Sequence, residues 1–370
     1  MANKFKQIED EQKRQEQASE GPLAWLDKKL RPIADLEGGA DWFKRQPQKR
    51  DYLLMIDDGG KDSGRDPIGV LAAGRVALLA SAGGVGKSHA LCQLALAVSV
   101  AHLQKTKWLG TFEVMKGGRV LLVMGEEEVE EIRRRLYDAA RVMGLEERQH
   151  VVALENIVPM ALAGQTGLAL THSEAERAGK AETPFAEALV ERLNASGPWT
   201  CIILDPLARF AGGDVEKDNA AATELVQVLE KLSHVAGNPT VVVAHHTRKS
   251  QSGGDGSKSA DDVRGSSALR DGVRFVAMLE DWERHDNAPR LVTFKVAKNN
   301  YGTSPPEIVL ARDSDRGGAL RRANKQEIED YNAANAANIA KKATEKSKAE
   351  KGRAEKPPDG PKSSAHLMGD

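Results

Sequence analysis

One octet, SAGGVGKS at residues 81–88, constrains the fold of this chain more than any other stretch. It follows the apolar run VALLA and precedes HALCQLALAV, which has a helical pattern. A glycine-rich turn between a strand and a helix cradles phosphate with its backbone N–H groups, while a lysine reaches the phosphates and a hydroxyl binds Mg²⁺. The first position, normally glycine, is Ser81, whose small side chain should cause little strain. We therefore predict that nine consecutive residues bind ATP: Ser81, Ala82, Gly83, Gly84, Val85, Gly86, Lys87, Ser88 and His89.

The apolar runs around this octet predict an α/β fold. Runs rich in Val, Ile and Leu are typical of parallel strands covered on both faces, and they occur at 76–80, 119–124, 201–205 and 239–245. Helical patterns alternate with them at 89–103, 129–143 and 219–236, which favours a mostly parallel sheet flanked by helices. Three later runs lack intervening helices and are expected to extend the sheet as antiparallel strands: 273–280, 290–299 and 306–313.

Composition divides the chain into three parts. Residues 1–66 form a charged, partly helical arm with scattered apolar anchors such as Trp25 and Trp42. Residues 67–322 form the α/β core. Residues 323–370 contain few large apolar groups, so we expect a mostly disordered tail with a frayed helix near its start.

Charge and cysteine content limit the setting of the protein. Its 53 basic and 54 acidic residues leave a formal net charge of −1, which neither favours nor excludes nucleic acid. The two cysteines, Cys92 and Cys201, lie in apolar stretches and are expected to be buried, reduced thiols. The chain has no apolar run of about 18 residues and no signal peptide, so we expect a soluble, cytoplasmic protein without membrane contact.

Two acidic positions complete the predicted nucleotide site. Glu126 is the first acid after the run at 119–124 and is the candidate base for the attacking water, with Glu127 as second choice. The alternative is that Glu126, Glu127 and Glu128 only cap the helix that follows. Asp205 ends the run CIILD, where an aspartate holds Mg²⁺ together with Ser88; a turn role is the alternative.

These motifs, in this order, resemble those of the RecA-like hexameric helicases, and most closely the plasmid replicative helicases of the RepA type. The resemblance spans about residues 67–320 and rests on SAGGVGKS, GEEE, LDPLARF, AHHTRKS, RGSSALRD and KVAKNNYG. The phosphate loop of that type also begins with serine, so Ser81 is interpreted as a family variant.

The resemblance implies roles for residues beyond the phosphate loop. His246 matches a sensor of the γ-phosphate, and Arg264 matches an arginine finger that reaches the neighbouring subunit's nucleotide. Lys298 matches a second cation acting between subunits, although Asn300 replaces a basic residue found in many relatives. The loop at 247–267 matches a central DNA-binding loop, with Arg248, Lys249 and Lys258 as phosphate contacts. The alternative is that this segment is a solvated surface loop. It contains no aromatic residue that could stack on bases.

Three functions follow from this pattern. The first is an ATP-hydrolysing, single-stranded-DNA-translocating replicative helicase of a plasmid, phage or mobile element, acting as a hexameric ring with Mg²⁺ and in contact with a primase or replication initiator. The second is a RecA-like ATPase switch or clamp that does not unwind DNA. The third is a small-molecule kinase, which the sequence favours least because no segment supplies a lid over an acceptor.

Overall fold

The computed structural model describes residues 26, 29–57, 67–173, 181–213, 215, 217–247, 267–286, 288–302 and 304–354. The chain divides into two compact units, Met1–Arg50 and Asp51–Asp370. The described part of the first unit contains two 3₁₀ turns, η1 (Ile33–Asp35) and η2 (Gly39–Asp41).

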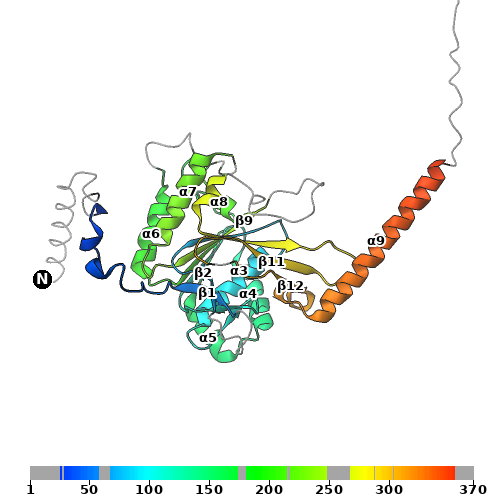
Figure 1. The fold of residues 1–370 in the computed structure, drawn as a ribbon, viewed down its shortest axis with the longest axis horizontal. Helices are drawn as coiled ribbons and strands as arrows, with labels where there is room; N and C mark the ends of the chain where they lie inside the picture. The colour runs from blue at the N-terminus through cyan, green and yellow to red at the C-terminus, as the bar shows by residue number, and fades with distance from the viewer. Residues whose placement is uncertain are drawn as a thin grey trace, which may run out of the picture. The chain divides into compact units, whose positions relative to one another are not determined.

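The second unit is built on a nine-stranded sheet (Figure 1) with the order β13-β12-β11-β10-β3-β9-β8-β6-β7. In chain order its strands are β3 (Val76–Ser81), β6 (Val120–Met124), β7 (Ile157–Ala161), β8 (Cys201–Asp205), β9 (Thr240–His246), β10 (Phe275–Asp281), β11 (Leu291–Asn299), β12 (Ile308–Asp313) and β13 (Ala319–Arg322). The strands from β10 to β7 run parallel, and β11, β12 and β13 continue the sheet in antiparallel pairs. This confirms the predicted fold class, a mostly parallel sheet with antiparallel strands on its C-terminal side.

One strand differs from the prediction. β10 pairs with β11 in antiparallel fashion, as expected, but it also pairs with β3 in parallel, with Phe275 opposite Ala77. The reason is the connection from β9 to β10, which contains the helix α8 (Ser267–Gly272). It returns the chain to the end of the sheet at which β9 begins, so β10 runs in the same direction as β9 and β3.

Helices cover both faces of the sheet because successive residues of its central strands point to opposite sides. Ala77 and Leu79 of β3 belong to a core shared with α3 (Lys87–Val100), α4 (Val129–Met143) and α5 (Glu147–Asn156). Val76, Leu78 and Ala80 belong to a second core shared with α6 (Pro184–Ser196), α7 (Asn219–Leu232) and α8. Figure 1 shows these two groups of helices on opposite sides of the strands.

A second, four-stranded sheet of order β2-β1-β5-β4 belongs to the same unit. It is formed by β1 (Tyr52–Ile56), β2 (Ile68–Ala72), β4 (Lys107–Trp108) and β5 (Phe112–Val114). The side chains of Leu53 and Leu54 are fully buried in the core that contains α3, so β1 is part of this unit. The unit therefore begins at Asp51, whereas composition placed the boundary after residue 66.

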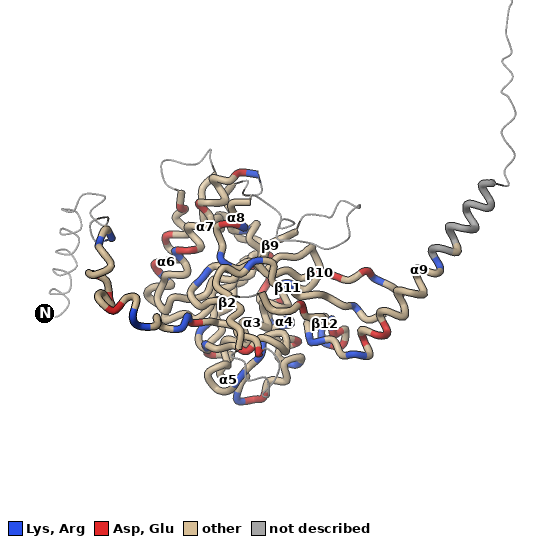
Figure 2. Tube along the Cα trace, in the orientation of Figure 1, with Lys and Arg blue, Asp and Glu red and all other residues tan. Residues whose placement is uncertain are grey.

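The last described element is the long helix α9 (Lys325–Ala354). Its first turns pack on the main unit, where the ring of Tyr331 lies 4.7 Å from that of Trp282 and its hydroxyl donates to the Glu283 carbonyl. Charged residues of both signs lie around β12 and the start of α9 (Figure 2). The helix extends well beyond the start of the segment 323–370, where a frayed helix was expected, and residues 355–370 lie outside the described residues.

Candidate nucleotide site

A cavity of about 270 Å³ lies at the edge of the sheet where the parallel strands end. Strand register places the relevant residues side by side: Ser81 at the end of β3 is opposite His246 of β9, and Met124 of β6 is opposite Asp205 of β8. Residues that the sequence assigned to the site line this one cavity, namely Gly83, Gly84, Gly86, Lys87, Ser88, His89, Glu126, Glu127, Asp205 and His246. Ligands of open α/β folds bind at this edge, outside the carboxyl ends of the strands.

The phosphate loop has the backbone that its glycines allow. Gly84 and Gly86 have φ values of 73° and 122°, which residues with a β-carbon rarely adopt. Val85 between them is buried and holds the loop on the core. The turn delivers the chain into α3, which begins at Lys87, so the first N–H groups of that helix face the cavity.

Ser81 has a direct contact with the lysine of the loop. Its hydroxyl accepts a hydrogen bond from Lys87 Nζ at 3.0 Å and donates one to the Ala82 carbonyl at 2.7 Å. Lys87 Nζ also donates to the carbonyls of Ser81 and Ala82, at 3.1 and 3.2 Å. Burial lowers the pKa of Lys87 to about 8, against the opposing effect of Asp205 and Glu126. A glycine at position 81 would lack the hydroxyl that orients this ammonium.

Asp205 and Ser88 fit a bound magnesium ion. The Ser88 hydroxyl hydrogen-bonds the Asp205 carboxylate, whose pKa is nevertheless raised by burial. Asp205 Oδ2 is buried without a hydrogen-bond partner among the described residues. No cluster of three or more His, Cys, Asp or Glu with metal-binding geometry occurs in the described part of the chain. One carboxylate and one hydroxyl suit Mg²⁺, which takes its remaining oxygens from phosphates and water.

The acidic residues after β6 have different partners. Glu127 forms an ion pair of 2.6 Å with Arg135 of α4, and Arg135 also bonds Glu131 at 3.0 Å. Glu126 is exposed, lines the cavity and is close enough to raise the pKa of Lys87. The turn that carries them is fixed by Gly125 N, which donates to the Asp205 carbonyl at 2.7 Å.

Sequence reasoning missed two arginines of the cavity, Arg135 and Arg312. Arg312 of β12 donates to the Gly84 carbonyl at 2.5 Å, and Arg290, next to β11, donates to the same oxygen at 2.8 Å. Burial and the nearby charge of Arg290 lower the pKa of Arg312. Burial also lowers the pKa of His89 to about 4, with Arg135 and Arg312 adding to the effect, so this ring is neutral at pH 7.

The two histidines that end β9 differ in position. His246, the assigned sensor, borders the cavity, whereas its neighbour His245 is buried. Lys298 is absent from the cavity lining, and its Nζ donates to the carbonyls of Arg270, Asp271 and Val273 at 2.9–3.0 Å, closing the end of α8. A role for Lys298 in a neighbouring site would require these bonds to break. Arg248, Lys249, Lys258 and Arg264 lie outside the described residues.

The sheet order, the phosphate loop after β3 and the carboxylates at the ends of β6 and β8 define a RecA-like P-loop ATPase core. A family model described as an AAA domain matches residues 65–252, just over half of the chain. The chain belongs to this family, and its core is an AAA-type ATPase domain. It also aligns with a solved structure described as an ATPase domain, over 68% of this chain and 85% of that one, with 14% identity and a TM-score of 0.45.

Among the helices that the structure describes, none is both long and apolar enough to cross a membrane.

Proposed function

We propose that this protein is an ATP-hydrolysing motor that translocates on single-stranded DNA as a ring, a hexamer, and serves as the replicative helicase of a plasmid, phage or mobile element. One observation carries the proposal: Lys87, Ser88, Asp205, Glu126 and His246 surround a single cavity. The basic segment 247–267 begins directly after His246 in the sequence, so the element proposed to contact DNA is covalently joined to the edge of the ATP site.

The residues around the cavity divide the chemistry of hydrolysis. The N–H groups at the start of α3 and the Lys87 ammonium bind the phosphates, and Ser88 and Asp205 would hold Mg²⁺, which neutralises phosphate charge. Glu126 orients the attacking water and accepts its proton as the bond from the γ-phosphorus to the bridging oxygen breaks. Glu126 is favoured over Glu127 for this role, because the Glu127 carboxylate is already held in an ion pair with Arg135.

Two further steps need groups beyond this cavity. Arg264 of a neighbouring subunit would stabilise the charge on the transferred phosphoryl group, which requires the homo-oligomer. His246 would respond to the γ-phosphate and pass the change to Arg248, Lys249 and Lys258 on the DNA backbone. A primase or replication initiator is the proposed protein partner. Because Lys298 is held by three carbonyls of its own chain, we assign it to the support of α8.

The second candidate is an ATPase switch or clamp in DNA metabolism that does not unwind. The same cavity favours it equally, because ATP binding and hydrolysis are common to both functions. The two differ in whether hydrolysis is coupled to movement along a strand.

Steady-state ATP hydrolysis by the full-length protein, with and without single-stranded DNA and across a range of salt concentrations, tests the proposal. Strong stimulation that fades with salt is expected, because contacts to the phosphate backbone release counterions. A strand-displacement assay then separates the helicase from the switch. A hydrolysis rate indifferent to DNA at every salt concentration would contradict the motor.

A further inference from the structure

A second cavity, of about 230 Å³, lies away from the phosphate loop. It is bordered by residues 104–107 at the start of β4, by residues 142–145 between α4 and α5, and by β13. Four of its lining residues are basic, Lys105, Lys107, Arg321 and Arg322, and none is acidic. By contrast, Glu126, Glu127, Glu131 and Asp205 all line the ATP cavity.

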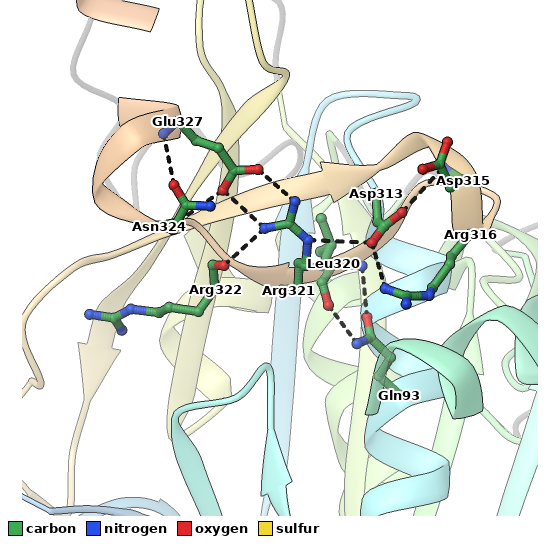
Figure 3. A network of polar contacts seen from close by, with 9 residues as sticks. All are labelled: Gln93, Asp313, Asp315, Arg316, Leu320, Arg321, Arg322, Asn324 and Glu327. Carbon is green, nitrogen blue, oxygen red and sulfur yellow. Dashed lines mark hydrogen bonds and ion pairs between the residues drawn. The ribbon is translucent and has the colours of Figure 1, made fainter. Parts of the chain in front are cut away.

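The four cations are not equally available to a ligand. Lys105 pairs with Glu113 at 3.0 Å, and Arg321 pairs with both Asp313 and Glu327, at 3.3 and 2.5 Å. Figure 3 shows the Arg321 guanidinium between these two carboxylates and the Arg322 side chain directed away from them. Within the described residues, neither Lys107 nor Arg322 forms an ion pair, and the Arg322 side chain bonds only the Thr111 hydroxyl, at 3.1 Å. Lys107 lies opposite Glu113 in the pairing of β4 with β5, but the Glu113 carboxylate is paired with Lys105.

A buried amide at the same cavity also lacks a partner. Gln149 of α5 lines the cavity and is only 4% exposed. Its Oε1 accepts the Glu146 backbone N–H at 2.9 Å in the capping box of α5, which fixes which end of the amide is the donor. Nε2 is buried and has no hydrogen-bond partner among the described residues. Leaving a buried donor unsatisfied is costly, and Gln149 lines the cavity, so we assign its acceptor to a ligand atom there. Nε2 is covered by its neighbours, which must move aside for that contact to form.

The walls of the cavity are held in place without a ligand. Gln93 of α3 donates through Nε2 to the Leu320 carbonyl at 2.7 Å and accepts from Leu320 N at 3.1 Å, as Figure 3 shows. This pair of bonds joins β13 to α3, and the ion pairs of Arg321 join β13 to α9. These contacts fix the backbone of β13, from which the Arg322 side chain projects, so the wall of the cavity does not have to be ordered by the ligand.

We propose that this second cavity binds a phosphate-bearing anion. An unpaired donor and two cations that form no ion pair suit phosphate oxygens, which accept several charge-assisted hydrogen bonds. The volume is small for a ligand pocket, so it suits one or two phosphate groups with the rest of the ligand outside. Such phosphates come from a free phosphorylated small molecule or from the backbone of a nucleic acid. The inference does not depend on the proposed function.

Calorimetric titration with pyrophosphate tests the site in the full-length protein after saturation with a non-hydrolysable ATP analogue and Mg²⁺. One pyrophosphate should bind per chain. Lys107→Ala and Arg322→Ala should each weaken that binding about tenfold, as expected for loss of a charge-assisted bond. Gln149→Glu should weaken it as well, because it keeps the acceptor used by Glu146 and replaces the donor with an oxygen. Arg133→Ala, an exposed cation of α4 paired with Glu130, is the matched control and should bind normally.

A second titration with an oligothymidylate strand distinguishes the two sources of phosphate. If the strand displaces pyrophosphate and the same variants weaken its binding, the phosphate belongs to nucleic acid; if not, it belongs to a free small molecule. If the ATP analogue is left out, so that the ATP cavity is free, two pyrophosphates should bind per chain. Lys107→Ala should then weaken the binding of only one of them. No pyrophosphate binding beyond the ATP cavity, or binding that ignores Lys107, Arg322 and Gln149, would overturn the proposal.

Discussion

At the residue scale, burial of the Lys87 ammonium links ATP binding to pH. In the nucleotide-free protein its pKa falls from the usual 10.5 to about 8. Phosphate favours the charged form, so bound ATP raises this pKa. ATP affinity should therefore be constant below about pH 8 and should fall above it, by up to about tenfold per pH unit. Calorimetric titrations of an ATP analogue between pH 7 and 9.5 measure this dependence.

The matched control for that pH dependence is Lys87→Arg, whose side chain stays charged throughout the range. Its affinity should be lower than that of the wild type but constant with pH. If the affinity of Lys87→Arg for the ATP analogue falls with pH as steeply as that of the wild type, a group other than Lys87 titrates.

The stability of the wild-type protein should change with pH in the direction opposite to its ATP affinity. Between pH 8 and 10.5 the unfolded chain binds more protons at this position than the folded one, so the nucleotide-free protein gains stability as pH rises.

The two acids after β6 should behave differently when substituted. Glu126→Gln is expected to lower single-turnover ATP hydrolysis about 10²- to 10⁴-fold while ATP still binds, because the general base is lost. Glu127→Gln removes the partner of Arg135 and should cost hydrolysis less than about tenfold. Rapid-quench measurement of one turnover, beside analogue binding, checks both. The reverse ranking would make Glu127 the base.

The sequence predicted those residues of the cavity lining that belong to a local motif. The glycines, Lys87 and the Ser88 hydroxyl lie in one octet, while Glu126 and Asp205 lie at the ends of apolar runs. The spacing of these residues along the chain was therefore enough to identify them. Arg135 and Arg312 were not predicted, because they reach the cavity from α4 and β12, and no spacing connects them to the loop. Lys298 has a suitable residue type and a suitable motif, but only the fold reveals its three carbonyl partners.

At the scale of elements, α9 is held by few contacts. Tyr331, the buried residue of its first turns, packs against Trp282 and bonds the Glu283 carbonyl. Tyr331→Ala should release the helix at a local cost of about 3 kcal/mol. Limited proteolysis and hydrogen exchange over residues 325–341 should then detect faster opening, with little change at β3. Tyr331→Phe, which loses only the hydrogen bond, should cost about 1 kcal/mol; equal exchange in both variants would mean the ring contributes nothing.

Elements buried on both faces were predictable, whereas short or peripheral ones were not. β3, β6 and β8 are continuous apolar runs, and each lies close to its expected range. β4 and β5 have two and three residues and are strands only because they pair with each other and with β1. The extent of α9 escaped prediction because its Ala, Lys and Glu composition gives no apolar periodicity, and its packing depends on distant residues such as Trp282.

At the scale of the whole molecule, the proposed finger requires that each active site contain residues of two chains. Lys87→Ala subunits and Arg264→Ala subunits should each be inactive alone, the first without phosphate binding and the second with ATP bound but not hydrolysed. Mixed in equal amounts, they should recover activity. In a closed ring of randomly arranged subunits, about one interface in four joins an intact Lys87 to an intact Arg264.

The experiment compares ATP hydrolysis of the mixture with that of either variant at the same total concentration. Recovery depends on subunit exchange, so the proteins are mixed before the ring is assembled by ATP analogue and DNA. A chain that carries both substitutions, mixed with Lys87→Ala, is the control and should stay inactive, because no interface then contains both groups. A mixture of the two single variants that stays equally inactive would place Arg264 in the active site of its own chain. Arg264→Ala turnover at the wild-type rate would exclude the finger altogether.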